Sequence, residues 1–264
     1  MPEGPSILIL KEELLQFRNK KVLEAAGNSK IDISRINGQK IIDFKSWGKH
    51  LLICFKDFFL RVHMLMWGSC RINEKKDAAP RLSLRFAKGE VNFYSCSIKM
   101  NEGDPNDVYN WSADVLSDAW NETAAIRTLK TQKDALVCDA LLDQTIFSGV
   151  GNIIKNEVLF RIRLHPTSLI GAVPAQKIKE LVKDARGYSF LFYEWKKAFE
   201  LKKHWLIYKK KTCPRCDIPL VRTYLGKTDR LSFYCNNCQE LYTKAKKTAK
   251  DPEVIFKKNP KKKK

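Results

Sequence analysis

The chain has 264 residues, and its 49 lysines and arginines outnumber its 29 aspartates and glutamates, which gives a formal net charge of +20 at pH 7. A hydrophobic content of 44% is enough for a packed core, so disorder along the whole chain is excluded. No segment approaches the ~18 consecutive apolar residues of a membrane span, and the acidic residues near the start argue against a signal peptide. We therefore expect an intracellular protein, cytoplasmic or associated with the nucleoid, with no membrane partner.

An opening helix is predicted for residues 2–19, because Ile7, Leu10, Leu14 and Phe17 recur on one helical face. From residue 40 onward, apolar and polar residues alternate, and this period of two predicts β-strands. The predicted strands span residues 41–47, 50–55, 58–65, 81–87 and 91–97. This half of the chain is therefore expected to form a β-sandwich or barrel preceded by a helix.

The spacing of apolar residues becomes helical past Trp111, over residues 123–160 and 175–203. Residues 165–174 contain two prolines and a glycine and predict a break between the two helical regions. The fold class expected from this order is α+β with several domains.

Four of the eight cysteines form two CxxC pairs, Cys213 with Cys216 and Cys235 with Cys238, separated by 18 residues. A zinc ion bound by four thiolates needs each pair on one tight knuckle, and residues 218–233 alternate as in a β-hairpin. The pattern predicts a zinc ribbon that holds one structural Zn²⁺ ion. The alternatives are chance CxxC pairs or disulfides, and a reducing intracellular compartment disfavours the disulfides. The other four cysteines lie in apolar stretches and are expected to be buried thiols: Cys54, Cys70, Cys96 and Cys138.

Residues 243–264 contain ten lysines against two acidic residues and are expected to form a disordered basic tail. The remaining residues still carry a net charge of +12. This distribution favours nucleic acid as the partner, ahead of an anionic membrane surface, because neutralised phosphates release counterions. The expected domains are a β-sandwich at 1–115, a helical domain at 116–204, a zinc ribbon at 205–242 and the tail at 243–264.

The N-terminus offers a candidate nucleophile. Pro2 is small enough to allow removal of Met1, which would expose a secondary α-amine directly followed by Glu3. Because an α-amine has a pKa near ~7.7–8.0, a useful fraction is neutral at physiological pH, and its condensation with an aldehyde-like carbon gives an iminium. The carboxyl of Glu3 could act as general acid or base. A Met-Pro start also has a structural explanation, since proline is favoured at the beginning of a helix.

Five motifs follow one another along the chain. They are MPEGP at 1–5, WGKHLL at 47–52, HMLMWG at 63–68, a segment from LDQ to NE at 142–157, and the two CxxC pairs. In this combination the sequence resembles the formamidopyrimidine-DNA glycosylase/endonuclease VIII family of base-excision repair enzymes, over essentially residues 1–240. The resemblance implies a helix–two-turn–helix domain between the β-sandwich and the zinc ribbon. It also implies a DNA glycosylase and AP lyase that binds damaged double-stranded DNA as a monomer and cuts the strand by β,δ-elimination.

The resemblance implies catalytic roles for three residues. Pro2, freed of Met1, matches the nucleophile that attacks C1′ of the damaged nucleotide. Glu3 matches the carboxyl that assists opening of the sugar ring by proton transfer. Lys49 matches the essential lysine on a hairpin turn near the lesion phosphate, whereas on its own it would be interpreted as an ordinary turn lysine.

The resemblance also implies three DNA contacts. Asn152 would lie where the N-terminus of a helix can hold a phosphate, a position that a simple helix cap would explain as well. Arg230 matches the zinc-ribbon arginine that clamps the phosphates flanking the lesion. Met66 matches the wedge that fills the gap left by an everted base, although a methionine in a strand more often belongs to the core.

Departures from the family pattern bear on the substrate. Ser6 stands where the family usually has glutamate, which leaves Pro2 and Glu3 unaffected. The stretch 179–213 is too short for the long loop with which the formamidopyrimidine branch covers an everted 8-oxoguanine, and Gly4 resembles the endonuclease VIII branch. We therefore expect oxidised pyrimidines and ring-opened purines as substrates, with an 8-oxoguanine/formamidopyrimidine glycosylase as the alternative.

Two functions from other classes are also compatible with parts of the sequence. A non-catalytic DNA- or RNA-binding protein with a zinc ribbon explains the charge and the cysteines, and predicts that changes at Pro2 or Glu3 leave every activity intact. A zinc-ribbon scaffold for protein partners requires neither Lys49 nor Arg230. It predicts weak DNA binding with little dependence on salt.

Overall fold

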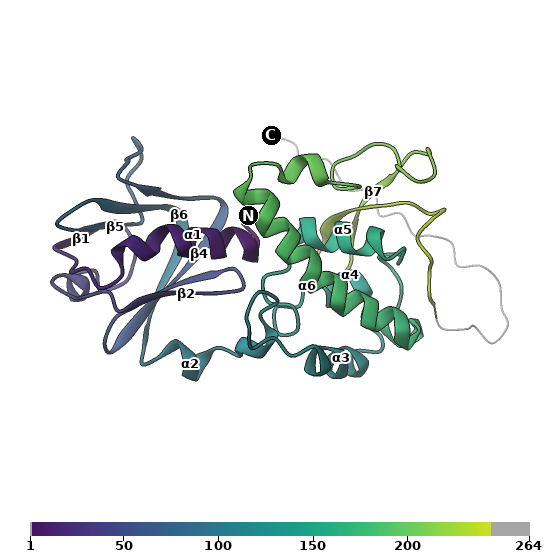
Figure 1. Cartoon of the computed structure of the whole chain (residues 1–264), viewed down its shortest axis with the longest axis horizontal. Coiled ribbons are helices and arrows are strands. Elements are labelled where there is room, and N and C mark those ends of the chain that lie inside the picture. Colours follow the sequence, from purple (N-terminus) through teal and green to yellow (C-terminus); the bar gives the residue numbers. More distant parts are fainter. Residues whose placement is uncertain (1, 244–264) are drawn as a thin grey trace, which may run out of the picture.

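A computed structural model describes residues 2–243 of the chain, so Met1 and nearly all of the predicted basic tail lie outside the described residues. Two lobes lie side by side along the longest axis (Figure 1). The first lobe is a β-sheet with one helix against it, and the second is built mainly of helices and carries a separate β-hairpin. The mixed, multi-domain fold class is confirmed, and the exact domain boundaries at 115 and 204 stay predictions.

The first lobe contains a six-stranded antiparallel sheet with the strand order β1-β5-β6-β4-β3-β2. Its strands are β1 (Glu24–Ala26), β2 (Asp43–Trp47), β3 (His50–Cys54), β4 (Phe58–Ile72), β5 (Leu82–Arg85) and β6 (Glu90–Glu102). The five predicted strands are all present, and β4 and β6 extend beyond their predicted ends. Strand β1 was not predicted, because three residues are too few to show a period.

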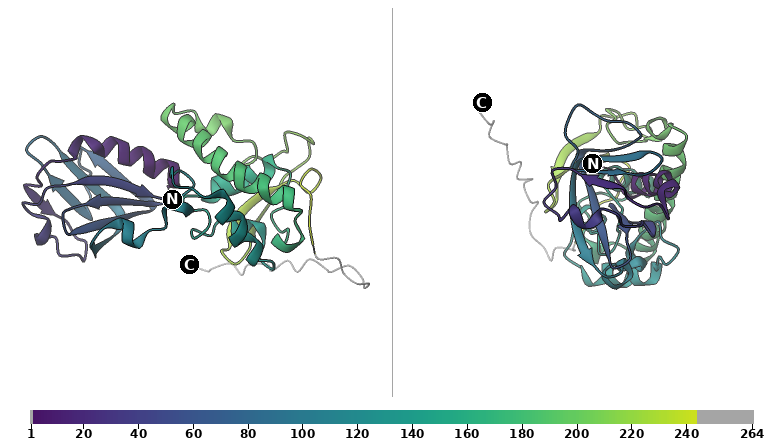
Figure 2. Two further views of the ribbon diagram at one scale, coloured as in Figure 1. Left: turned by 60° about the horizontal axis from the view of Figure 1, so that its bottom comes forward. Right: turned by 90° about the vertical axis from the view of Figure 1, so that its left-hand side faces the viewer.

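Helix α1 (Gly4–Leu14) lies along one face of this sheet and contacts β2 and β3 (Figure 2). Ile7 and Leu14 are buried, as the helical period predicts, and they join a core formed by the inward-facing residues of the strands. A short 3₁₀ turn (Leu15–Phe17) completes the predicted helix. The N-terminal end of α1 points towards the junction of the two lobes (Figure 1).

The second lobe is connected to the sheet through residues 103–121, which include α2 (Pro105–Val108). Its helices are α3 (Glu122–Thr131), α4 (Val137–Ala140), α5 (Asn152–Arg161) and α6 (Ala175–Lys197). Helices α3, α5 and α6 pack around a second hydrophobic core, and the break predicted at 165–174 separates α5 from α6. Helix α6 ends at Lys197, and residues 201–204 form a separate 3₁₀ turn.

Strands β7 (Val221–Leu225) and β8 (Arg230–Tyr234) form the predicted hairpin between the two CxxC pairs. Phe233 and Cys235 pack with Phe160 at the end of α5 and with Ile207, so this hairpin has a small core of its own against the helical lobe. Within residues 2–243, no helix has the length and apolar character needed to cross a membrane.

Candidate active site at the junction of the two lobes

Glu3 is a buried carboxylate at the junction of the lobes. Its side chain is only 4% exposed, and its oxygens accept hydrogen bonds from the backbone N–H groups of Gly151 (3.1 Å), Ile153 (2.7 Å) and Ile154 (3.2 Å). These groups belong to the first turn of α5, where a negative charge is favoured by the helix dipole. Burial nevertheless raises the pKa of Glu3, against the opposing effect of these amides and of Lys49. Glu3 is therefore suited to hold a proton that an exposed carboxyl would release.

Two glycines allow three distant segments of the chain to meet at this point. The N–H of Gly4 donates to the carbonyl oxygen of Gly149 at 2.8 Å, and a Cβ on Gly4 would lie 2.8 Å from the Cα of Gly149. Gly48 has a φ of +52°, and a Cβ there would collide with the hydroxyl of Ser148. The N-terminal segment, the β2–β3 turn and the loop before α5 therefore pack backbone against backbone.

Lys49 lies in the two-residue turn that connects Trp47 to His50, with Gly48 at the first turn position. A positive φ at that position is typical of a type II′ hairpin turn. Burial lowers the pKa of Lys49, the nearby Glu3 opposes this shift, and the charge of Arg230 adds to it. The structure therefore brings Glu3, Lys49 and Arg230 into electrostatic contact, although they are far apart in the sequence.

Asp114 fixes this turn from the second lobe and was not identified from the sequence. Its side chain is 4% exposed, and its two carboxylate oxygens accept from the N–H of Gly48 and the N–H of Leu116, each at 2.9 Å. Burial raises the pKa of Asp114 to about 6. No local pattern marks an aspartate that bonds to a turn 66 residues away, so the sequence offered no signal for it.

Two histidines next to Lys49 were also not predicted as site residues. His50 and His63 are directly opposite on β3 and β4, with ring centroids 5.3 Å apart. Burial and nearby positive charges lower the pKa of His50 to about 4 and also lower the pKa of His63. His50 is therefore neutral at physiological pH.

Helix α5 connects the buried site to the hairpin. The side-chain amide of Asn152 donates to the carbonyl oxygen of Leu231 at 2.9 Å, and that of Asn156 accepts from the N–H of Phe233 at 2.8 Å. On the same helix, Glu157 accepts from the N–H groups of three consecutive residues, 206–208, at 2.8–3.0 Å. Helix α5 thus binds the carboxylate of Glu3 at the N-terminus of the helix, and its asparagines orient strand β8, which carries Arg230.

The interpretation of Asn152 as a helix cap is wrong. The N-cap residue is Gly151, which has no side chain, and the carboxylate of Glu3 accepts from the free N–H groups at the start of the helix instead. The N–H groups of Gly151, Ile153 and Ile154 already donate to Glu3, so they are not free to bind a phosphate. The prediction that Asn152 contacts DNA remains untested.

Lys155 and Asp139 are hydrogen-bonded to the β7–β8 hairpin. Lys155 is 1% exposed, and its Nζ donates to the hydroxyl of Ser232 at 2.8 Å; that hydroxyl in turn donates to the carbonyl oxygen of Arg230 at 3.2 Å. Asp139 accepts from the N–H of Lys227 at 3.0 Å in the β7–β8 turn. The two charged side chains fix the strand on which Arg230 lies.

Replacing Lys155 with methionine is expected to stabilise the protein at neutral pH. Burial lowers the pKa of Lys155 to about 8, whereas an unfolded lysine titrates near 10.5. The unfolded chain therefore binds the extra proton between these two pH values, so the unfolding free energy of the wild type rises with pH across that window, by about 3 kcal/mol. Urea unfolding at pH 7.5 and pH 10.5 should show this rise in the wild type and not in Lys155→Met; the same rise in both proteins would contradict it.

Met66 is 64% exposed, so it does not belong to the core. The pairing of β4 with β6 shifts register between Met64 and Ser69, and the residues between them project from the sheet. Leu65 and Trp67 are exposed as well, at 46% and 83%. The exposure of this apolar tip is compatible with the predicted wedge, and the wedge role of Met66 stays a prediction.

The four ribbon cysteines meet in one cluster. All four sulfur atoms lie within 4.8 Å of one another, and those of Cys213 and Cys238 are 3.8 Å apart. Four sulfurs about 2.3 Å from one tetrahedral ion are about 3.8 Å from each other, so the cluster fits a metal ion of this kind. The other four cysteines carry free thiols whose pKa values burial raises to about 11 or 12: Cys54, Cys70, Cys96 and Cys138.

Two family models match most of the chain. The formamidopyrimidine-DNA glycosylase N-terminal domain matches residues 1–97, and the formamidopyrimidine-DNA glycosylase H2TH domain matches residues 112–187. The chain belongs to the formamidopyrimidine-DNA glycosylase/endonuclease VIII family. Membership in this family confirms the helix–two-turn–helix domain that the sequence motifs implied.

Curated relatives of this family member include endonuclease 8-like 3 of Xenopus laevis, which is 32% identical over 242 residues, 87% of this chain and 39% of the relative. Endonuclease 8-like 3 of Homo sapiens is 32% identical over 217 residues, 79% of this chain and 36% of the relative. Endonuclease 8-like 2 of Bos taurus is 34% identical over 198 residues, 69% of this chain and 58% of the relative. The chain thus spans less than two-thirds of the length of these relatives.

Solved structures share the fold of this family member. A formamidopyrimidine-DNA glycosylase from Lactococcus lactis, bound non-covalently to DNA containing an AP site, superposes with a TM-score of 0.81 at 19% identity, over 90% of this chain and 99% of that one. A viral DNA glycosylase gives a TM-score of 0.78 at 18% identity, over 90% of this chain and 100% of that one. At these identities the superpositions establish the fold alone.

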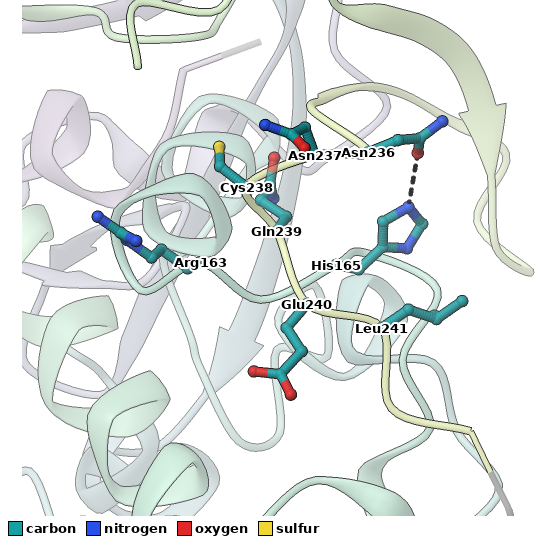
Figure 3. Close-up of a pocket in the computed structure, with 8 residues that line it drawn as sticks. All are labelled: Arg163, His165, Asn236, Asn237, Cys238, Gln239, Glu240 and Leu241. Carbon is teal, nitrogen blue, oxygen red and sulfur yellow. Dashed lines mark hydrogen bonds between the residues drawn. The ribbon is translucent and has the colours of Figure 1, made fainter. Parts of the chain in front are cut away.

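A pocket of about 570 Å³ lies away from the junction, beside the cysteine cluster (Figure 3). It is lined by Arg163, His165 and residues 236–241, and His165 is hydrogen-bonded to Asn236 at 3.3 Å. None of the residues at the junction lines this pocket.

Proposed function

We propose that the chain is a base-excision repair DNA glycosylase with AP lyase activity, in which the amine of Pro2 is the nucleophile. The observation that supports this most strongly is that Glu3, which directly follows Pro2 in the chain, lies near Lys49 at the lobe junction, and that Arg230 lies near Lys49 as well. A buried carboxyl with a raised pKa, next to two basic side chains that can hold phosphates, is the set of groups that the reaction requires.

In the proposed reaction, the lone pair of the Pro2 nitrogen attacks C1′ of an everted nucleotide, and the damaged base leaves with the electron pair of the glycosidic bond and takes up the proton that the Pro2 nitrogen releases. Glu3 transfers its proton as the sugar ring opens, and the nitrogen and C1′ become an iminium. Loss of a proton from C2′ then expels the 3′ phosphate, and a second elimination expels the 5′ phosphate. Lys49 and Arg230 position these phosphates, each as a charge-assisted donor.

The four cysteines would hold one Zn²⁺ ion. Four thiolates leave no open coordination position, so the ion would stabilise the fold and take no part in the reaction. Its effect on function passes through the β7–β8 hairpin, because Cys235 directly follows the strand that carries Arg230.

Damaged double-stranded DNA is the proposed substrate, bound by a monomer inside the cell, with Met66 filling the gap left by the everted base and Asn152 near the phosphates. Oxidised pyrimidines and ring-opened purines are preferred, because residues 198–212 between α6 and the first CxxC pair are too few for a long loop over 8-oxoguanine. The endonuclease 8-like names of the relatives favour the same branch.

Rates of base release and strand cutting test this function. Zinc-loaded protein freed of Met1 is incubated with duplexes that contain dihydrouracil, thymine glycol, 8-oxoguanine or a plain AP site. We expect excision of the two pyrimidine lesions to exceed that of 8-oxoguanine, and cutting of the AP site on both sides of the sugar. Binding to every duplex without any cutting would refute the enzyme and leave a non-catalytic DNA-binding protein.

A further inference from the structure

The outer face of strands β4 and β6 carries cations and hydrogen-bond donors next to the Lys49 turn. Leu60, Val62, Met64 and Ile98 point into the core, so the residues that alternate with them point outward. The outward residues are Arg61 and His63 on β4, and Ser97, Lys99 and Asn101 on β6; Phe59 also lies on this face, where it is buried against Tyr109. Residues 59–65 and 95–101 contain no aspartate or glutamate at all.

Two positive charges are paired directly across this face. Arg61 is opposite Lys99 in the antiparallel register, and neither side chain forms an ion pair with any residue from 2 to 243. Like charges directly opposite each other destabilise a sheet. A third group, the hydroxyl of Tyr109, contacts Arg61 but brings no negative charge. An anion bound between Arg61 and Lys99 would remove the repulsion.

This face is continuous with the candidate active site. His63 is opposite both His50, which follows Lys49, and Ser97, so one row of residues connects the turn to the outer face. The charges of Lys49 and Arg61 both act on His63. The Arg61–Lys99 pair lies two residues further along the strands, roughly 7 Å, which is about two base-pair steps of B-DNA.

We propose that the Arg61–Lys99 face binds the phosphodiester backbone of DNA outside the lesion, so that the DNA footprint extends from the Lys49 turn across the sheet. This inference rests on the proposed function, because the same DNA is the substrate. A polyanion fits the Arg61–Lys99 pair, whose side chains can only donate, and the exposed tip at Leu65–Trp67 lies on the same strand. An acidic protein would also complement the two positive charges, but its binding would not explain why this face adjoins the candidate active site.

The test is the salt dependence of DNA binding. The double variant Arg61→Gln/Lys99→Gln is compared with the charge-matched control Lys88→Gln/Lys130→Gln, which changes two exposed lysines elsewhere. The affinity for a duplex with a tetrahydrofuran AP-site analogue is measured by fluorescence anisotropy from 50 to 300 mM salt. We expect the slope of log K against log salt to fall by about 2 in the double variant, with roughly tenfold weaker binding at 100 mM salt. The control should retain nearly the wild-type slope.

A slope equal to that of the control would overturn the inference. Thermal unfolding checks the fold, and the double variant should be at least as stable as the wild type, since the repulsion is removed. Strand cutting at a saturating protein concentration separates this inference from the proposed function. A smaller slope in the double variant, together with a wild-type protein that does not cut AP sites, would support the face and refute the enzyme. An unchanged slope in the double variant, together with normal cutting by the wild type, would refute the face alone.

Discussion

Replacing Glu3 with glutamine is expected to lower the rate of base excision by about 10²–10⁴-fold, the usual contribution of a positioned acid or base. Glutamine has the same shape but has no proton to transfer, and only one of its two terminal atoms can accept from the N–H groups at the start of α5. The rate should be measured in single turnovers on a dihydrouracil duplex. Glu13→Gln is the matched control, because Glu13 is an exposed glutamate on α1, the helix that Glu3 directly precedes.

The pH dependence gives this prediction a direction. Burial raises the pKa of Glu3 above its ordinary value of 4.5, so the folded state favours the protonated carboxyl. The stability that this proton contributes is complete below pH 4.5 and is lost as the pH rises through the higher folded value. The excision rate of the wild type should fall as the pH rises through the folded pKa of Glu3. In Glu3→Gln, neither the excision rate nor the stability should change in this pH range for this reason. A wild-type excision rate in Glu3→Gln would refute the role of Glu3.

Replacing Cys235 with serine is expected to abolish stable metal binding and to weaken DNA binding by 100-fold or more. Three thiolates and a hydroxyl hold zinc poorly, and the binding free energy of a structural zinc ion, about 10–16 kcal/mol in zinc-finger peptides, contributes directly to folding. The small core around Phe233 and Ile207 is too limited to maintain the hairpin on its own. Arg230 would then lose its place opposite Lys49.

Metal content after gel filtration and the affinity for an AP-analogue duplex measure this effect. Cys70→Ser is the control, because Cys70 is a half-buried thiol of β4 outside the cluster. The control should bind one zinc ion and bind DNA like the wild type. A Cys235→Ser protein that retains both zinc and DNA affinity would show that the four cysteines do not form a structural site.

Local periodicity was sufficient to predict the main elements of the fold. The helical repeat of Ile7 and Leu14 arises from burial of one face of α1, and the apolar run of β3 arises from burial of both faces of that strand, and both are local properties of the sequence. Strand β1 was missed because it exists only through its pairing with β5. The length of β4 was underestimated, because its second half is interrupted by the register shift after Met64 and shows no regular alternation.

The candidate site was predicted in part, and only where a motif marked it. Pro2, Glu3 and Lys49 occur in recognisable motifs, and the four cysteines have a metal-binding spacing. Asp114 and Lys155 bond to atoms 66 and 77 residues away, and such contacts leave no local pattern. The error at Asn152 has the same origin, because the group at the start of α5 comes from Glu3, 150 residues before Ile153.

The central claim is that the amine of Pro2 attacks the sugar, and the most direct measurement is to trap the intermediate and locate it. The protein is incubated with an AP-site duplex and borohydride, digested, and analysed by mass spectrometry. We predict a reduced sugar adduct on the N-terminal peptide at Pro2, and no adduct in a form that carries one extra residue before Pro2, because its nitrogen is then an amide. An adduct on a lysine such as Lys49, or no adduct with protein freed of Met1, would contradict the account.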